Sequence, residues 1–358
     1  MTASVLDRAG LKTRVDKALG AFLARRRDQL AAIDEALLPV ADTIEKFVLG
    51  GGKRLRPAFA YWGYRAAGGV DRDEVVAGAA ALEFVQASAL IHDDVMDGSD
   101  TRRGEPAVHR RFASLHRESR WLGDPADFGT ASAILLGDLC LVWSDALLHG
   151  SGLEPATLAR ARPVFDDMRT EVTVGQYLDI HTQVTGDTSL QRAGLVARFK
   201  SAKYTVERPL LLGAAFANAP DEVVRAYSAF GLPLGEAFQL RDDVLGVFGD
   251  PAVTGKPSGD DLRSGKRTVL LAEAIELAAK SDPGAAELLR SSVGTELSDA
   301  QVRDLRRVIE SVGALAAVEE HIELLTTRSL EAIDAAPIDA QAKAGLAKLA
   351  RLAANRSA

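Results

Sequence analysis

Residues 90–97 read Leu90-Ile91-His92-Asp93-Asp94-Val95-Met96-Asp97. This stretch follows an apolar, helix-forming segment that runs from Val75 to Ile91. If this helix continues to Met96, Asp93 and Asp97 stand one turn apart on the same face. Two carboxylates stacked in this way repel each other unless a cation lies between them. Mg²⁺ suits this position, because proteins usually bind it through one or two carboxylates together with phosphate oxygens.

A second stretch repeats the pattern. The segment from Phe238 to Leu245 places Asp242 and Asp243 at the end of another apolar helical pattern, which begins at Tyr227. A basic loop that contains glycine follows each acidic helix end. Taken alone, one such end is equally well explained as a solvated surface. Two of them indicate one site with two walls, where carboxylates hold metal ions, the ions hold a diphosphate, and Lys and Arg bind the remaining phosphate oxygens.

Five motifs, in this order and over nearly the whole chain, resemble those of the trans-isoprenyl diphosphate synthases (polyprenyl synthetases). Each motif alone is weakly specific, whereas five in order are strongly specific. They are Gly51-Gly52-Lys53-Arg54-Leu55-Arg56-Pro57; Gln86 with His92-Asp93-Asp94, Asp97 and Arg102-Arg103-Gly104; Gly175-Gln176-Tyr177-Leu178-Asp179; Lys200-Ser201-Ala202; and Phe238-Gln239-Leu240-Arg241-Asp242-Asp243.

The resemblance implies an all-α, single-domain helical bundle around a deep central cavity, the isoprenoid synthase fold. It also implies a homodimer that condenses isopentenyl diphosphate head-to-tail with an allylic diphosphate (dimethylallyl, geranyl or farnesyl). The family's reaction depends on Mg²⁺, with three ions in each active site, and Mn²⁺ can replace it. The main product expected here is geranylgeranyl diphosphate, with medium-chain, long-chain or farnesyl products as alternatives.

The resemblance also assigns roles to individual residues. Asp93 and Asp97 would hold two metal ions and Asp242 the third. The allylic diphosphate would contact Arg102, Lys200 and Lys266, and Ser201 and Gln239 would face the carbocation. Isopentenyl diphosphate would bind Lys53, Arg56, Arg103 and Gln86. Lys256 is a further substrate-binding candidate, and the expected supporting residues behind the ligands are Asp94, Gln176, Asp179, Asp243 and Asp261.

One position departs from the family pattern. Many members have a third Asp four residues after the first in the second acidic motif, and here Gly246 stands there. Asp242 is therefore the expected ligand of that motif, and Asp261 is expected to hydrogen-bond metal-bound water. Ser201 replaces the usual Thr, which keeps the hydroxyl.

Composition sets the broad class. The chain has 358 residues, 47% of them hydrophobic and 26% charged, and its evenly spread helical pattern favours one large α-domain over residues 1–358. A net charge of −7 argues against nucleic acid as a partner. A single cysteine, Cys140, excludes an intrachain disulfide. The N-terminus lacks a secretory h-region, and no apolar run reaches membrane-spanning length, since Asp138 interrupts the most apolar one; we therefore expect a cytoplasmic enzyme.

Helical periodicity predicts a helix from Val5 to Leu30 and a second from Ala31 to Val48, which Gly50-Gly51-Gly52 ends. Three cations then precede a helix start, a favourable anion site. Asp71 or Asp73 is predicted to cap the helix that leads to Asp93, and Asp138 is predicted to be hydrogen-bonded. A kink or break is predicted at Pro209 within 190–217. Further helices are predicted at 59–67, 155–182, 268–279, 284–292, 298–311, 315–335 and 339–353. Residues 114–129 are predicted to form a flexible loop and residues 249–266 a loop that covers the site.

Two other functions use related residues. A class I terpene cyclase would keep Asp93 and Asp97, but it would carry an Asn/Ser/Glu metal motif on the later helix and would leave the cations from Lys53 to Arg56 idle. A non-catalytic partner subunit would usually lose one Asp motif, and both are present here. Consumption of isopentenyl diphosphate by the purified chain alone discriminates these functions.

Product length is predicted from the helix that ends at Asp93. Ser88 and Ala89 lie about one turn before Asp93, where short-chain relatives carry an aromatic ring that blocks the growing tail. Because both side chains are small, the floor must lie lower, at Val85 or Phe84 if either faces the cavity, roughly 6 Å further along. That predicts geranylgeranyl diphosphate. If both face away, Ala80 and Ala81 leave a deeper tunnel and longer products.

Overall fold

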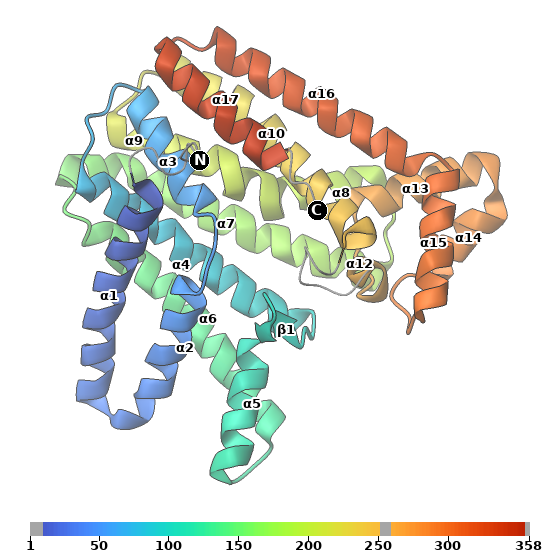
Figure 1. Ribbon diagram of the computed structural model, residues 1–358, viewed down its shortest axis with the longest axis horizontal. Coiled ribbons are helices and arrows are strands. Elements are labelled where there is room, and N and C mark those ends of the chain that lie inside the picture. Colours follow the sequence, from blue (N-terminus) through green and yellow to red (C-terminus); the bar gives the residue numbers. More distant parts are fainter. Residues whose placement is uncertain (1–9, 251–258, 355–358) are drawn as a thin grey trace. The chain divides into compact units, whose positions relative to one another are not determined.

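The structure is a computed structural model that describes residues 10–250 and 259–354. Helices make up almost all of it (Figure 1). The N-terminal half contains α1 Leu11–Ile33, α2 Leu38–Leu49, α3 Leu55–Ala66, α4 Asp73–Met96, β1 Thr101–Arg102, β2 Glu105–Pro106, α5 Val108–Ser119, α6 Pro125–His149 and α7 Pro155–Thr185. The rest contains α8 Leu190–Val196, the π-helix η3 Ala197–Glu207, α9 Arg208–Ala217, α10 Asp221–Phe248, α12 Asp260–Arg263, α13 Val269–Ser281, α14 Pro283–Ser292, α15 Asp299–Ser311, α16 Ala314–Ala335 and α17 Ala340–Ala354.

The chain divides into two compact units, each built from separate stretches of sequence. The first unit takes Met1–Asp166, Pro209–Asp221 and Ile338–Gly345, and the second takes Asp167–Arg208, Glu222–Pro337 and Leu346–Ala358. The all-α fold predicted from the sequence is confirmed, whereas the prediction of one domain over 1–358 stays a prediction.

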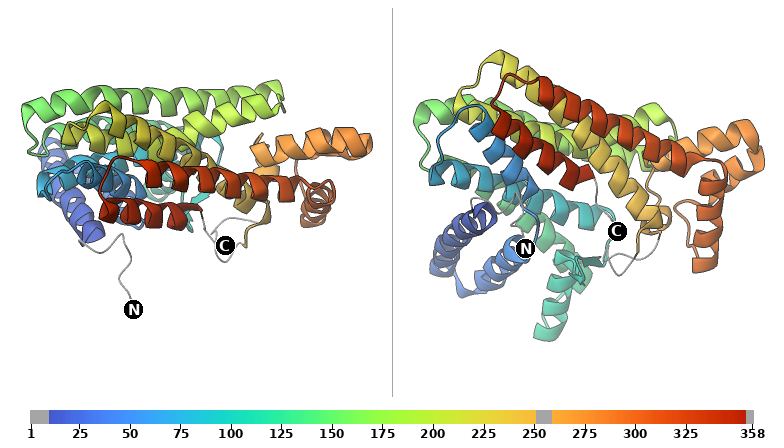
Figure 2. Two further views of the ribbon diagram at one scale, coloured as in Figure 1. Left: turned by 90° about the horizontal axis from the view of Figure 1, so that it is seen from above. Right: turned by 45° about the horizontal axis from the view of Figure 1, so that its top comes forward.

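In the first unit α4 is the central helix. It packs along α6 and also contacts α1 and α3 (Figure 1), while α1 and α2 form an antiparallel hairpin (Figure 2). Phe84 on α4 is fully buried, and its ring lies 5.3 Å from that of Phe22 and 6.1 Å from that of Trp143. This aromatic cluster ties α1, α4 and α6 together.

The second unit has its own apolar core. Ala237, Leu240, Val244 and Val247 of α10 pack there with buried residues of α13, α14, α15 and α16. Ser298 caps α15, and its hydroxyl and the Gln301 side chain form a capping box. The carboxyl-terminal third of α10 is therefore anchored on its apolar face just where Asp242 and Asp243 occur.

Several predicted boundaries differ from the structure. Residues 114–129 are not a loop: α5 continues to Ser119 and α6 begins at Pro125. The rings of Phe112, His116 and Trp121 pack around the ring of Phe128. These contacts stabilise the helices, although the many charged residues of the segment indicated a loop. Of the predicted loop at 249–266, residues 251–258 lie outside the described part, and α12 forms within the remainder.

Local predictions near helix ends were also corrected. The N-cap of α4 is Arg72 without a side-chain cap, because Asp71 and Asp73 both accept hydrogen bonds from Arg14. Asp138, predicted to be hydrogen-bonded, is exposed, and its Oδ1 lies 3.6 Å from Nε2 of His92. The first helix starts at Leu11 as far as the structure describes it, α2 starts at Leu38, and α3 already starts at Leu55.

The predicted kink near Pro209 takes the form of a π-helix that precedes it. Residues 197–207 are π-helical, and Pro209 is the second residue of α9. Proline has no N–H to donate and its ring crowds the preceding turn, which disfavours an uninterrupted α-helix. π-helical turns occur frequently at functional sites, and this one carries Lys200 and Ser201.

Two helices are long and apolar enough to cross a membrane by length and composition, so the prediction that no run reaches that length was wrong. They are α4 and α6, and 72% and 50% of their most apolar windows are buried inside the protein. Core helices of soluble proteins pass the same test, so the finding is weak evidence for a membrane span.

Close packing of α9 on α3 generates a stability prediction. A β-carbon at Gly213 would overlap the carbonyl oxygen of Ala60 and lie 2.6 Å from the backbone nitrogen of Tyr64. We expect Gly213→Ala to lower the free energy of unfolding by about 1–3 kcal/mol, measured by urea denaturation. The matched control is Gly20→Ala in α1, where a β-carbon meets nothing within 4 Å. It should raise stability by about 0.5–1 kcal/mol. Equal effects of the two changes would contradict this packing.

Candidate active site

The first acidic helix end has the predicted backbone. Helix α4 continues to Met96, and the N–H of Asp97 donates to the carbonyl of Asp93 at 2.8 Å. The i, i+4 relation of Asp93 and Asp97 is thus confirmed. Asp93 is 9% exposed, Asp97 is half-buried, and Asp94 between them is completely buried.

Arg102 is held against this helix end by a small hairpin. Strands β1 and β2 pair through Arg102 and Glu105, and the two residues between them, Arg103 and Gly104, both have positive φ (55° and 77°). These signs are those of a type I′ turn, which suits a two-residue hairpin. Sequence reasoning treated this segment as a basic loop; the glycine at the second turn position was the signal for a hairpin.

Arg102 forms a buried ion pair with Asp94. Its Nε donates to Asp94 Oδ1 at 2.9 Å, its Nη2 donates to the same oxygen, and Nη2 lies 3.4 Å from Asp93 Oδ2. Burial raises the pKa of Asp94, an effect that the hydrogen bond and charge of Arg102 only partly oppose. Burial would lower the pKa of Arg102, but its contacts with Asp94 outweigh this and raise it. Asp94 thus anchors the hairpin to the helix.

The glycine-rich loop before α3 brings cations together. Gly51 and Gly52 have φ of 126° and 121°, values that favour glycine, and Lys53 beside them is exposed. Arg103 Nη1 donates to the carbonyl of Gly51 at 3.4 Å. Burial lowers the pKa of Arg103; the charge of Glu83 acts against this, and the charges of nearby arginines, Arg56 among them, act with it.

Arg54 is the exception among the three predicted cations of this loop. Only 4% of its side chain is exposed, and its guanidinium is paired with Glu83 and Asp16. Lys53 and Arg56 therefore remain as the candidate anion-binding cations of this loop. Sequence reasoning missed Glu83; an acidic residue inside the apolar run of α4 was the signal for a buried partner.

In the second unit Lys200 and Asp179 are paired. Lys200 Nζ donates to Asp179 Oδ2 at 2.6 Å, and Asp179 is only 6% exposed. A β-carbon at Gly175 would lie 2.6 Å from the backbone carbon of Phe199, so this glycine permits the close approach of α7 to the π-helix. Gln176 and Ser201 are half-buried on the same two elements.

Asp243 is the buried member of the second acidic pair. Burial raises its pKa to about 8, the Gln239 hydrogen bond lowers it, and the charges of Asp261 and Asp242 raise it further. Gln239 Nε2 donates to Asp243 Oδ1 at 2.7 Å. Since the side-chain amide nitrogen of Gln239 is bonded to Asp243, the side-chain carbonyl oxygen of Gln239 points away from Asp243. Asp242 beside it is half-buried.

Gly246 has a role that its place in the motif did not indicate. A β-carbon there would overlap the Oδ2 atom of Asp261. The carboxylate of Asp261 therefore lies against α10 at the position where many family members carry a third Asp. The absence of a side chain at Gly246 thus leaves room for the buried carboxylate of Asp261.

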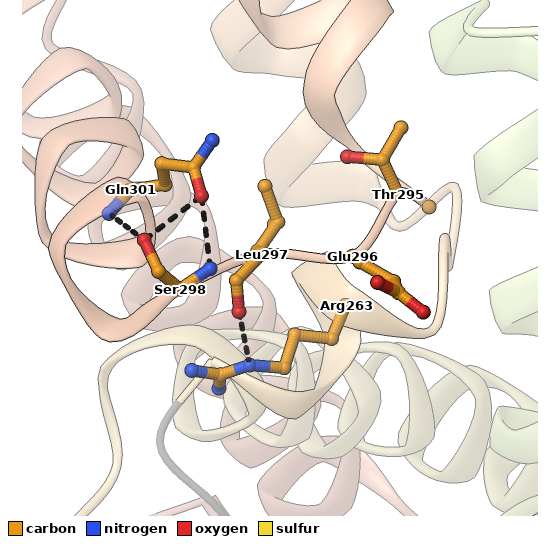
Figure 3. A pocket seen from close by; sticks show the side chains of 7 residues that line it. Arg263, Thr295, Glu296, Leu297, Ser298 and Gln301 are labelled. Atoms are coloured by element: carbon orange, nitrogen blue, oxygen red, sulfur yellow. Dashed lines mark hydrogen bonds between the residues drawn. The ribbon is translucent and has the colours of Figure 1, made fainter.

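The segment that carries Asp261 and Lys266 is fastened to the loop before α15. Gly294 N–H donates to the carbonyl of Leu262 at 2.9 Å, and Arg263 Nε donates to the carbonyl of Leu297 at 3.2 Å (Figure 3). Arg263 also lines an open pocket, whose other lining residues are Gly294, Thr295, Glu296, Leu297, Ser298 and Gln301. None of the predicted site residues lines this pocket. Lys256 lies outside the described residues.

The donor chemistry fits magnesium. Across residues 10–250 and 259–354 no group of three or more His, Cys, Asp or Glu side chains is arranged to hold a metal on its own. Asp93 and Asp97 near the end of α4 in the first unit, and separately Asp242 in the last third of α10 in the second, offer hard oxygen donors. Oxygen donors of this kind suit Mg²⁺, which keeps part of its coordination for phosphate oxygens and water.

The chain-length candidates all lie on α4. Phe84, Val85 and Ser88 are buried, and Ala89 is half-buried. The Phe84 ring belongs to the cluster with Phe22 and Trp143 described above, so its position is fixed from two neighbouring helices. Gln86 on the same helix is half-buried.

Comparisons with known proteins agree with one another. A family model described as polyprenyl synthetase matches residues 39–312. The chain is 36% identical over 259 residues to a geranylgeranyl diphosphate synthase of Methanosarcina mazei, covering 70% of this chain and 74% of that protein. It is 30% identical over 301 residues to a geranylfarnesyl diphosphate synthase of Aeropyrum pernix, covering 83% and 87%.

One solved structure is similar throughout. It is a geranylgeranyl pyrophosphate synthase of Corynebacterium glutamicum, complexed with isoprenyl diphosphate and magnesium, with 43% identity and a TM-score of 0.94 over 97% of this chain and 99% of that chain. The family match covers well over half of the chain and includes both acidic motifs. The chain therefore belongs to the polyprenyl synthetase family and is a trans-prenyltransferase.

Proposed function

We propose that this enzyme makes geranylgeranyl diphosphate from isopentenyl diphosphate and an allylic diphosphate. The observation that carries the product is the pair of small side chains, Ser88 and Ala89, one turn before Asp93, with Phe84 buried one turn further. Two small residues leave room for a tail longer than farnesyl, and the Phe84 ring would limit that tail if it faces the cavity. The geranylgeranyl synthases among its relatives support the same product.

The proposed residue roles fall into two groups, one for each diphosphate. Asp93 and Asp97 of the first unit and Asp242 of the second would hold three Mg²⁺ or Mn²⁺ ions on the allylic diphosphate. Arg102, Lys200 and Lys266 would bind the same diphosphate. Isopentenyl diphosphate would lie against Lys53, Arg56, Arg103 and Gln86. The diphosphate that leaves is thus held by metals, and the one that stays is held by fixed cations.

Magnesium, when bound, neutralises the charge that develops on the leaving diphosphate. The allylic C–O bond breaks, and the carbocation is stabilised by the backbone of Lys200 and Ser201 and by the Gln239 carbonyl dipole. The hydrogen bond from Gln239 to Asp243 supports this orientation of the amide. The isopentenyl double bond then forms the new C–C bond, and a proton leaves to the departing diphosphate. The cations hold the two substrates together, which replaces a bimolecular encounter.

We further propose a cytoplasmic homodimer. Exposed apolar side chains on α6, namely Ile134, Leu135 and Val142, support a partner that covers this helix. A terpene cyclase is disfavoured because Arg56 and Arg103 form a second cation group that one substrate would leave idle. A non-catalytic subunit is disfavoured because both acidic motifs are intact.

The metal roles are tested with carboxamide variants. We expect Asp93→Asn or Asp242→Asn to lower turnover by orders of magnitude, because each loses a charged metal ligand, while far-UV circular dichroism stays unchanged. EDTA should abolish condensation, and added Mg²⁺ should restore it. The matched control, Asp28→Asn, changes an exposed residue of α1 and should retain full activity. Undiminished activity in EDTA would contradict the metal mechanism.

The Asp261 arrangement gives a second prediction. Because a β-carbon at Gly246 overlaps the Asp261 carboxylate, Gly246→Ala should displace that side chain and raise the Mg²⁺ concentration needed for half-maximal activity. Gly194→Ala in α8 is the control in the same unit, since a β-carbon there meets nothing within 4 Å. An unchanged Mg²⁺ dependence in an active Gly246→Ala enzyme would show that Asp261 does not serve the metal site.

Product length is tested one turn before Asp93. We expect Ser88→Phe to shorten the main product toward farnesyl diphosphate, because the ring would block the tail, with products sized by chromatography after phosphatase treatment. The control is Ser119→Phe on α5, where the side chain is exposed. Ser132 does not serve as a control position, because it is buried as Ser88 is. Unchanged product length in an active Ser88→Phe enzyme would mean that the tail does not pass this turn.

A further inference from the structure

Arg54 has an unusual backbone for its residue type. It is the N-cap of α3, with φ 53° and ψ 39°, in the left-handed region that costs energy for a residue with a β-carbon. Its neighbours in sequence are Lys53 and, two residues on, Arg56. A strained residue at this position must be held there by its surroundings.

The side chain of Arg54 supplies that restraint. Its Nη1 donates to Glu83 Oε2 at 2.6 Å, its Nη2 donates to the carbonyl of Val48 at 2.9 Å, and its Nε donates to Asp16 Oδ1 at 2.7 Å. These partners lie on α4, α2 and α1, so one guanidinium joins the loop to three helices. The Glu83 and Arg54 side chains are only 7% and 4% exposed, and the bond between them is shielded from water.

The same pair lies next to the other cations of the loop. Arg103, which donates to the carbonyl of Gly51, feels the charges of both Glu83 and Arg54. Glu83 Oε1 is buried without a hydrogen-bond partner among the described residues. Glu83 therefore places a buried negative charge close to the positive charges of Arg54 and Arg103.

We infer that Arg54 is a positioning residue: its buried pairing with Glu83 holds the left-handed turn that presents Lys53 and Arg56 to the diphosphate of isopentenyl diphosphate. This inference rests on the proposed function, since it assigns that substrate to this loop. A buried ion pair contributes little net stability compared with apolar side chains of similar size. Its value here is geometric, because it fixes the one turn that separates two substrate-binding cations.

Two variants separate positioning from stability. Arg54→Met leaves Glu83 buried without its cation and should unfold at lower urea concentration. Arg54→Met/Glu83→Leu removes both charges and should recover much of that stability. In the double variant the affinity for isopentenyl diphosphate should still fall, on the order of 10–100-fold, since a displacement near 1 Å has effects of that size. The KM for the allylic substrate should stay within about threefold.

Affinity is measured by calorimetry with isopentenyl diphosphate in EDTA, and KM for each substrate by steady-state kinetics. Arg14→Met is the matched control, because Arg14 of α1 also pairs with two carboxylates of the first unit, Asp71 and Asp73, and neither belongs to the glycine-rich loop. It should bind isopentenyl diphosphate as the wild type does. Lys53→Ala should lose affinity directly.

Wild-type affinity in the double variant would overturn the inference and make the pair merely structural. A loss of affinity for both substrates alike would overturn it too, because the effect would not be local to this loop. If the wild type binds isopentenyl diphosphate but does not elongate an allylic diphosphate, the proposed function fails. Calorimetry on the Arg54 variants still decides whether Arg54 positions the loop. If the wild type binds none, both fail.

Discussion

A carboxylate that is buried in an apolar helix must either pair with a cation or become neutral, because an isolated charge is too costly to bury there. The structure meets this constraint separately in each unit. Asp94 is paired with Arg102 and Glu83 with Arg54 in the first unit, and Asp179 is paired with Lys200 in the second. Each pair also fixes a loop, a hairpin or a π-helix that carries a substrate-binding candidate. Charge compensation and the placement of functional side chains are therefore the same set of contacts.

Glycines make the second contribution by allowing backbones to touch. Gly175 permits α7 to approach the π-helix, and a β-carbon at Gly235 of α10 would lie 2.7 Å from the Cα of Ala202 on that π-helix. The π-helix is thus enclosed from two sides along its functional residues. This explains how a segment with a poorer hydrogen-bond geometry than an α-helix remains stable beside Lys200 and Ser201. Gly246 acts differently, because it leaves room for a side chain rather than for a backbone.

Much of this architecture was predictable from the sequence. The end of α4, the capping box of α15 and both acidic pairs follow from apolar periodicity and short motifs, which are local signals. The hairpin at Arg103-Gly104 and the helix at 114–119 were missed because their stability comes from Arg102 pairing with Asp94 and from rings around Phe128. Arg54 was counted as a ligand-binding cation because its partners, Asp16 and Glu83, are distant in sequence. Glu83 inside the apolar run of α4 signals a buried partner, but a single sequence does not indicate which cation that partner is.

We propose that this chain elongates an allylic diphosphate to the geranylgeranyl length. The most direct measurement incubates the purified wild-type enzyme with Mg²⁺, isopentenyl diphosphate and, in separate reactions, dimethylallyl, geranyl or farnesyl diphosphate, and identifies the dephosphorylated products by mass spectrometry. We expect geranylgeraniol as the main alcohol from every primer that is accepted. Farnesol as the end product, a series of much longer alcohols, or a cyclised hydrocarbon would contradict it.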